Sequence, residues 1–160
     1  MVLKEIVLNC ISKFKKTTFL TQKRQQRGSI FKKSVPMIRI AIQSELEMRR
    51  VSYAALLQQY SEFEVVFQAN DNKELASQLA KKPVDVVLYC WNSANEIDFN
   101  AFDKLSKKHP GLTVLIATQD YYARTFQKVL DRNFMGYFRE NSSANELKKA
   151  LCQLADTVSL

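Results

Sequence analysis

The sequence predicts an α/β fold, specifically a flavodoxin-like doubly wound parallel sheet of five strands in the order 2-1-3-4-5, with helices on both faces. Two observations support this class. Five short apolar segments alternate with five segments in which apolar residues have helical spacing, and the connections between them are short. The third apolar segment, 84–90, is almost continuously apolar, which is typical of a central strand covered on both faces.

Each strand is predicted by a run of apolar and β-branched residues. The five runs are residues 37–42, 63–67, 84–90, 112–118 and 134–138. Consecutive runs are far enough apart to leave room for one helix, and neighbouring parallel strands need such a crossover. In sheets of this type the ligand site lies at the carboxyl ends of the strands.

Each helix is predicted by apolar residues three or four positions apart. In chain order these residues are Tyr53, Leu57 and Tyr60; Leu75 and Leu79; Phe99, Phe102 and Leu105; Phe126, Val129 and Leu130; and Leu147, Leu151, Leu154 and Val158. Asp71 with Glu74, and Ser143 with Glu146, have the spacing of a capping box at the start of a helix. Asp120 is predicted to cap the fourth helix.

The pattern assigns residues 37–158 to one domain and leaves 1–36 as a basic leader. The leader holds nine Lys or Arg and one acidic residue, whereas residues 37–160 hold fifteen of each sign. Pro36 marks the boundary, because proline disfavours helix at the residue before it. We expect a poorly ordered leader. It could bind nucleic acid or an acidic membrane surface, or it could reflect a start assigned upstream of Met37.

Composition argues against several classes of function. No run of about 18 apolar residues is present, and the N-terminus lacks the apolar segment of a signal peptide. The balanced charge of the domain predicts that the domain itself does not bind nucleic acid. Cys10, Cys90 and Cys152 lack CxxC spacing, which favours free thiols and a cytoplasmic location. His109 is the sole histidine, so no metal site is predicted.

Seven short segments carry a resemblance to a known family through their order and spacing. They are IRIAI, FEVVF, PVDVVL, HP, LIAT, GYFRE and SSANEL, between residues 38 and 147. From residue 37 to about 158, the sequence resembles the receiver domain of bacterial response regulators, and most closely receivers that carry a LuxR-type helix-turn-helix output domain. The resemblance implies the fold predicted above and a role in two-component signalling, a phosphorelay that controls transcription.

The resemblance also implies where phosphorylation chemistry would lie. In the family, an acidic pair after the first strand and an aspartate ending the third strand hold Mg²⁺, and that aspartate accepts the phosphoryl group. A Thr or Ser ending the fourth strand and a Lys ending the fifth contact the phosphoryl oxygens. In this sequence the acidic pair falls on Ser44 and Glu45, the phosphoacceptor on Cys90, the hydroxyl on Thr118 and the lysine on Glu140.

This sequence departs from the family's residue types at Ser44, Cys90 and Glu140. Glu45 is the one carboxylate left to hold a metal ion, so Mg²⁺ binding is expected to be lost or weak and no cofactor is predicted. A carboxylate at Glu140 would repel a phosphoryl group rather than stabilise it. Arg139 is one residue away, where strand alternation points it to the other face. Thr118 is kept, and Tyr137 stands where the family has a switch aromatic, so these two could still support two conformations.

We interpret the chain as a pseudo-receiver that is not an enzyme and acts without phosphorylation. It would work through protein contacts, as a homodimer or by docking to an output domain, with the fourth helix, fifth strand and last helix as the candidate face. One alternative is an atypical phosphorylatable regulator. Another is a redox or ligand sensor that uses the vacated pocket at Cys90. A thiolate there would need a base or cation, whereas Glu45 and Glu140 would raise its pKa. Trp91 is expected to plug the pocket.

Overall fold

The structure is a computed structural model that describes residues 36–119 and 121–157. Predictions on the leader up to residue 35, on Asp120 and on Val158 lie outside the described residues. The strands are β1 (Ile38–Gln43), β2 (Phe63–Ala69), β3 (Val86–Cys90), β4 (Thr113–Thr118) and β5 (Met135–Arg139). The helices are α2 (Glu47–Leu57), α3 (Asn72–Leu79), α4 (Phe99–Lys108), α5 (Ala123–Leu130) and α6 (Ala144–Asp156).

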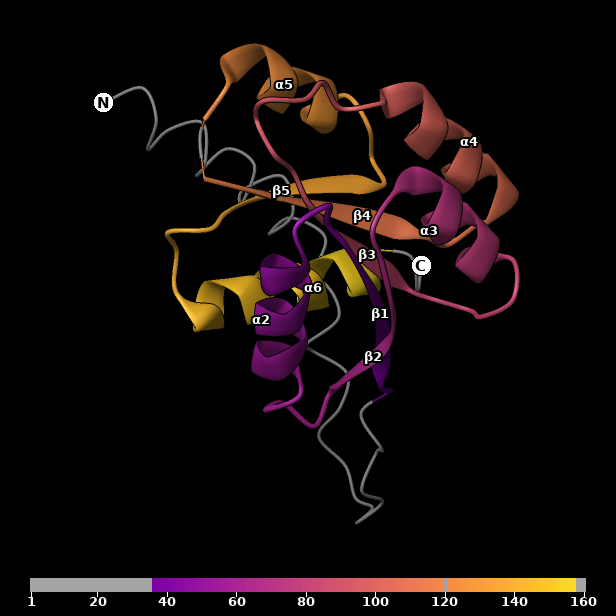
Figure 1. The fold of residues 1–160 in the computed structure, drawn as a ribbon, viewed down its shortest axis with the longest axis vertical. Helices are drawn as coiled ribbons and strands as arrows, with labels where there is room; N and C mark the ends of the chain where they lie inside the picture. The colour runs from indigo at the N-terminus through magenta and orange to yellow at the C-terminus, as the bar shows by residue number, and fades with distance from the viewer. Residues whose placement is uncertain (1–35, 120, 158–160) are drawn as a thin grey trace, which may run out of the picture. The chain divides into compact units, whose positions relative to one another are not determined.

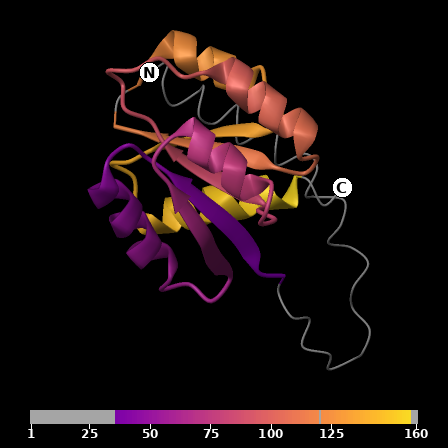
Figure 2. The ribbon, with the colours of Figure 1, turned by 45° about the vertical axis from the view of Figure 1, so that its right-hand side comes forward.

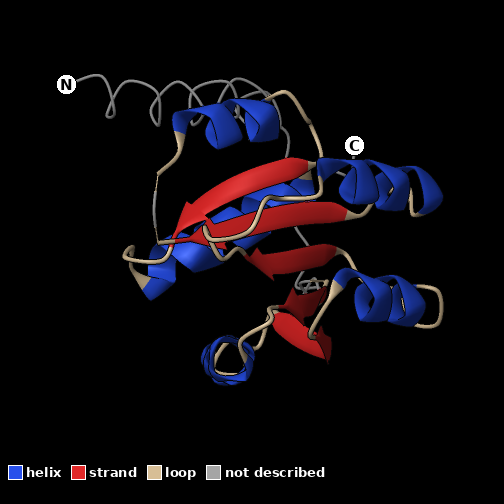
Figure 3. Cartoon of the chain, turned by 45° about the horizontal axis from the view of Figure 1, so that its top comes forward, coloured by secondary structure: helices blue, strands red, loops and turns tan. Residues whose placement is uncertain are grey.

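All strand pairs are parallel, and the sheet order is β2-β1-β3-β4-β5, which confirms the predicted topology (Figure 1). Helices α3, α4 and α5 cover one face of the sheet, and α2 and α6 cover the other (Figures 1 and 2). Figure 3 shows the sheet as the middle layer between these helices. Among the described residues, no helix is long and apolar enough to cross a membrane.

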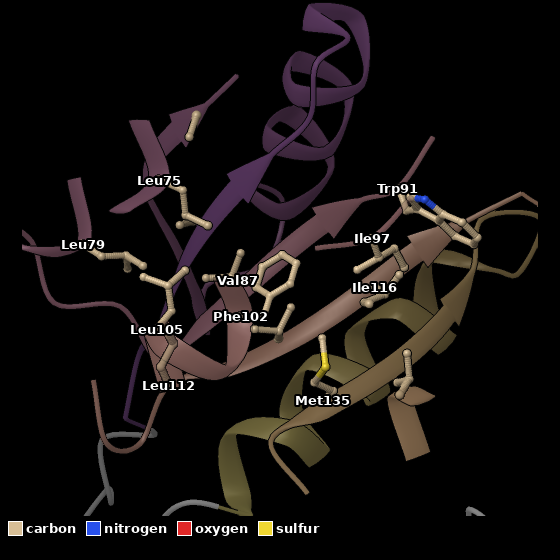
Figure 4. Close-up of a cluster of buried hydrophobic side chains, with 14 of the residues drawn as sticks. Leu75, Leu79, Val87, Trp91, Ile97, Phe102, Leu105, Leu112, Ile116 and Met135 are labelled. Carbon is tan, nitrogen blue, oxygen red and sulfur yellow. The ribbon is translucent and has the colours of Figure 1, made fainter. Parts of the chain in front are cut away.

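Strand alternation divides the core into two clusters, one on each side of the sheet. The cluster under α3, α4 and α5 contains Val87 and Ile116 from the central strands, together with Phe102 from α4 (Figure 4). The cluster under α2 and α6 contains Leu88, Cys90 and side chains from both helices. Because β3 contributes alternately to both clusters, it is covered on both faces, as its apolar sequence predicts.

Two of the five described helix starts, those of α3 and α6, follow the predicted capping signals. The Asp71 side chain accepts the backbone N–H of Glu74 at 2.8 Å, and Ser143 with Glu146 forms a reciprocal capping box. Helix α4 gains a further cap from Asp98, which accepts the N–H of Ala101 at 3.0 Å. These bonds satisfy N–H groups that have no partner within the first turn of a helix.

Three details of the helices differ from the prediction. Helix α5 begins at Ala123, and Tyr122 at its N-cap position makes no side-chain cap. Leu130 is 39% exposed instead of facing inward, because it lies at the end of α5. Helix α2 ends at Leu57, and Tyr60 lies in the turn beyond it, although Tyr60 still packs against the core beneath α2.

Side-chain bonds tie β1 to the segment before β3 at the amino end of the sheet. The Asp85 carboxylate accepts the backbone N–H of Arg39 at 2.8 Å and two guanidinium bonds at 2.7 and 3.1 Å. The guanidinium holds the pKa of Asp85 below its ordinary value, although partial burial acts in the opposite direction. This pair links two neighbouring strands at the edge opposite to the predicted site.

Gly136 marks a close approach between β5 and α6. A Cβ atom at this position would lie 3.0 Å from one methyl carbon of Leu154 and 3.2 Å from a methyl carbon of Leu115. The absence of a side chain therefore lets α6 pack directly on the sheet beneath it. This packing fixes the start of the chain segment that leads to Glu140.

Candidate functional site

The predicted site positions lie along the carboxyl edge of the sheet, but strand alternation divides them between its two faces. Cys90 packs in the cluster under α2 and α6. Ile116 and Tyr137 pack toward the opposite cluster, and Thr118 follows Ile116 by two positions, so these side chains face away from Cys90. Glu140 follows β5, and its side chain lies on the α2 side. The structure therefore brings Glu140, but not Thr118, to the Cys90 side.

Arg49 and Tyr53 of α2 hold the side chain of Glu140. The Tyr53 hydroxyl donates a hydrogen bond to Glu140 Oε1 at 3.1 Å, and the Arg49 guanidinium forms an ion pair with Glu140 Oε2 at 3.4 Å. A second guanidinium nitrogen of Arg49 donates to the backbone carbonyl of Trp91 at 3.2 Å. Because Arg49 and Tyr53 are four residues apart on α2, their side chains lie on one face of the helix. This network joins α2, β5 and the end of β3.

Cys90 is 4% exposed and lies in an environment that disfavours a thiolate. Burial, with Glu140 second, raises the pKa of its thiol to about 12, and Arg49 acts in the opposite direction. Burial, with Glu140 second, also raises the pKa of Tyr53 above its ordinary value. Both groups are protonated at neutral pH, so the site contains no activated nucleophile of the kind that a thiolate would provide.

Ser44 and Glu45, the positions of the family's acidic pair, make different contacts. The Ser44 side chain is buried, and its hydroxyl oxygen accepts the backbone N–H of Leu46 at 3.2 Å. Its carbonyl accepts a hydrogen bond from Arg50. Glu45 is exposed, and both of its carboxylate oxygens accept from the Asn95 amide, at 3.1 and 3.3 Å. The Glu45 carboxylate is thus satisfied by hydrogen bonds from the Asn95 amide, whereas the family's acidic pair binds a metal ion.

Solved structures with this architecture come from several organisms. The receiver domain of RcsB from Salmonella enterica serovar Typhimurium, with a phosphomimetic, has 18% identity and a TM-score of 0.64, over 72% of this chain and 86% of that chain. The receiver domain of the putative response regulator NarL from Mycobacterium tuberculosis has 15% identity and a TM-score of 0.66, over 76% and 98%. This chain has the fold of a response-regulator receiver domain.

A third structure, the complex of the CheA3 P1 domain with CheY6 from R. sphaeroides, has 19% identity and a TM-score of 0.65, over 76% of this chain and 98% of that chain. The structure of RcsB in its DNA complex has 18% identity and a TM-score of 0.67, over 76% of this chain. The match covers 61% of that longer chain. No family model and no curated protein matches the sequence, so the likeness rests on structure.

The residues at the receiver site do not fit the Mg²⁺ ion that the family uses. A magnesium site takes oxygen ligands, of which one or two are carboxylates at close to octahedral positions. Within residues 36–119 and 121–157, no three His, Cys, Asp or Glu side chains gather as a metal-binding group. Ser44 and Cys90 stand at two of the family's carboxylate positions, and the carboxylate of Glu140 is paired with Arg49.

Trp91 does not plug the pocket at Cys90, contrary to the prediction. Its ring is 5% exposed and packs in the cluster under α3, α4 and α5, beside Ile97 (Figure 4). Its indole N–H donates to the carbonyl of Asn95 at 2.7 Å, and its ring meets that of Tyr122 at a centroid distance of 5.4 Å. Trp91 follows Cys90 directly, so it faces the other side of the sheet.

Sequence reasoning missed the function of Arg49 and Tyr53 in covering the site. The sequence predicts Tyr53 only as a packing residue on the first helix and assigns no role to Arg49. The usable signal is their spacing of four on the helix that follows β1, directly after the acidic-pair positions. A cation there pairs with the acid that stands at the family's lysine position, Glu140.

The predicted switch pair lies on the α5 side of the sheet. The Tyr137 ring meets the rings of Phe126 at 5.4 Å and Tyr121 at 6.4 Å, both edge-on. Thr118 is 1% exposed, and its backbone carbonyl accepts the N–H of Glu140 at 2.9 Å. Thr118 thus contacts Glu140 through a backbone hydrogen bond, whereas the Tyr137 side chain packs among aromatic rings.

Proposed function

We propose that this chain is a phosphorylation-independent pseudo-receiver, a cytoplasmic signalling module for transcriptional control that acts through protein contacts and has no enzymatic activity. The observation that carries the proposal is the network in which Arg49 and Tyr53 hold Glu140 beside Cys90. In a receiver, the positions of Cys90 and Glu140 supply the phosphorylated aspartate and a lysine. Here a buried thiol stands at the first position, and the acid at the second is engaged with Arg49 of α2.

Phosphoryl transfer to Cys90 is unfavourable for two reasons that add. The thiol is buried and its pKa is raised to about 12, so very little of the attacking thiolate exists at neutral pH. The incoming phosphoryl group is an anion, and Glu140 would repel it at the position where a receiver offers a lysine. Glu45 is the one carboxylate at the family's metal-ligating positions, which is too little to recruit Mg²⁺ for charge neutralisation.

The test is incubation of the protein with acetyl phosphate and Mg²⁺, followed by intact mass spectrometry. We expect no phosphoryl adduct on the wild-type chain or on a Cys90→Asp variant. In both, Ser44 supplies no carboxylate to bind Mg²⁺, and Glu140 supplies no positive charge to stabilise the phosphoryl group. A triple variant that adds Ser44→Asp and Glu140→Lys is the matched control that should gain an adduct. A stable adduct on the wild-type chain would support an atypical phosphorylatable regulator and overturn the proposal.

Protein contact through the α5–β5–α6 face is the second part of the proposal. Receiver-fold neighbours make protein contacts: RcsB has been solved as two dimers bound to two parallel DNAs, and CheY6 in complex with a P1 domain. In this chain α5 exposes Leu130 together with Arg124 and Lys128, a mixed surface suited to a protein partner. Sedimentation velocity should show a dimer that Leu130→Glu weakens and Val51→Glu, on α2, leaves intact. Equal effects would contradict this choice of face.

A redox sensor at Cys90 is the less favoured alternative. A sensor thiol needs a low pKa and access to oxidant, whereas this thiol is 4% exposed and has a raised pKa. The other form of this alternative, a ligand sensor, depends on a cavity rather than on thiol chemistry, and it does not need Cys90 to react.

A further inference from the structure

A cavity of about 340 Å³ opens at the carboxyl edge of the sheet, between the ends of β1 and β3. The start of α3 and the loop from β3 to α4 form its walls. Ser44, Glu45 and Cys90 also line it, so the cavity lies at the position of the receiver site, although Arg49 and Glu140 are not among its lining residues. In the order β2-β1-β3, the connections after β1 and β3 lead to opposite faces, and doubly wound sheets bind ligands at this point.

The floor of the cavity contains a buried acceptor without a partner. Gln43 and Tyr89 are paired in register across β1 and β3, so their side chains lie next to each other on the α3–α4 face. Gln43 is 4% exposed, and its amide nitrogen donates to Asn72 Oδ1 at 2.7 Å. Its Oε1 atom has no hydrogen-bond partner among the described residues. A ligand with N–H groups would satisfy this acceptor, which otherwise carries the cost of desolvation.

The rim of the cavity is acidic. Glu45, Asp71, Glu96 and Asp98 line it, against one basic side chain, Lys73. Asp71 and Asp98 each accept a backbone N–H as helix caps.

The acids of the rim lie close to the aromatic floor. The pKa of Tyr89 is raised to about 12, first by burial, then by Glu45, Cys90 and Asp98. Glu45 and Asp98, from two different loops, line the same cavity as Tyr89, and the Tyr89 ring packs edge-on against Phe102 at a centroid distance of 5.1 Å. An aromatic face flanked by carboxylates attracts organic ammonium groups by cation–π and ionic forces.

We infer that this cavity binds a small aliphatic polyamine, with one ammonium group hydrogen-bonded to Gln43 Oε1 and the rim carboxylates and with its alkyl chain over Tyr89. The alternative of a metal ion fits less well, because the described acidic side chains do not gather as a metal-binding group. An ammonium group supplies the N–H donors that a metal ion lacks. This inference goes beyond the proposed function and does not depend on whether the chain is phosphorylated.

The test is calorimetric titration of the full chain, free of nucleic acid, with spermidine at constant ionic strength. We expect saturable binding to one site. The double variant Glu45→Gln/Asp98→Asn should weaken it by about tenfold or more, since it removes two charges but keeps the acceptors for Asn95 and for the α4 cap. Glu64→Gln, an exposed acid on β2 outside the cavity, is the control for net charge.

Three results would overturn the inference: no saturable binding, an equal loss of affinity with Glu64→Gln, or full displacement of spermidine by Mg²⁺ at constant ionic strength. A second measurement needs no variant. In an NMR titration of the wild-type chain, the side-chain amide signals of Gln43 should shift with spermidine along the same saturation curve. Unchanged Gln43 signals would contradict the assigned site even if binding were observed.

Discussion

Replacement of Glu140 by Lys tests whether its ion pair with Arg49 holds the carboxyl edge of the domain together. The side chains are 11% and 20% exposed, and their charged atoms lie 3.4 Å apart. At an effective dielectric constant of about 20, the attraction is about 5 kcal/mol before desolvation. Because desolvation offsets much of this gain, we expect Glu140→Gln to cost about 2 kcal/mol of unfolding free energy. Glu140→Lys should cost about 3 to 4 kcal/mol, since it adds repulsion between two cations.

Urea unfolding at neutral pH, followed by circular dichroism, measures these costs as shifts of the midpoint. Asp156→Lys, at the exposed end of α6, makes the same charge change and should shift stability by less than about 0.5 kcal/mol. In an Arg49→Met background, Glu140→Gln should cost much less than in the wild-type chain. A coupling energy below about 0.5 kcal/mol between positions 49 and 140 would refute the ion-pair argument.

Three further predictions concern other parts of the domain. Cys90 should resist alkylation by iodoacetamide in the native protein at neutral pH and react once urea exposes it. The reason is that its thiol is buried and its pKa is raised to about 12. Fast labelling of the native protein would contradict this prediction. Arg39 lowers the pKa of Asp85, so the ionised Asp85 carboxylate stabilises the fold above about pH 4, and this stabilisation is lost as the pH falls through the lowered pKa. In acid titrations of unfolding free energy, the Asp85→Asn variant should lose less stability on acidification than the wild-type chain. Gly136→Ala should destabilise by about 1 to 3 kcal/mol in urea, because its Cβ would lie 3.0 Å from a methyl carbon of Leu154; an unchanged midpoint would show that α6 can move away.

The parts of the fold that depend on local signals follow from the sequence. The spacing of Asp71 and Ser143 to the acids three residues later marks two helix starts, because a capping bond is made within one turn. The apolar run of β3 predicts a strand covered on both faces, and Val87 and Leu88 pack on opposite faces. The connection at Asp120 is different: α5 begins three residues later, without a side-chain cap that a sequence pattern could reveal.

The site could be predicted only in part, because its contacts join residues far apart in the chain. The sequence predicts that Cys90 and Glu140 stand at the carboxyl edge, and strand alternation alone shows that Trp91 must face away from Cys90. It does not reveal that Arg49 of α2 contacts Glu140, because the helical spacing of residues does not show whether a basic side chain points to solvent or to a partner. The unpartnered oxygen of Gln43 is likewise a property of packing, not of residue type.

The ion pair between Arg49 and Glu140 also has a consequence for how the sequence can change during evolution. Either residue alone, without its partner, would leave a largely buried charge uncompensated, so the two positions are expected to change together. Homologues that carry a lysine at position 140 should have an uncharged residue at position 49. Such covariation would show that selection maintains a paired charge at these two positions, whereas independent change at each would show that the pair is not maintained.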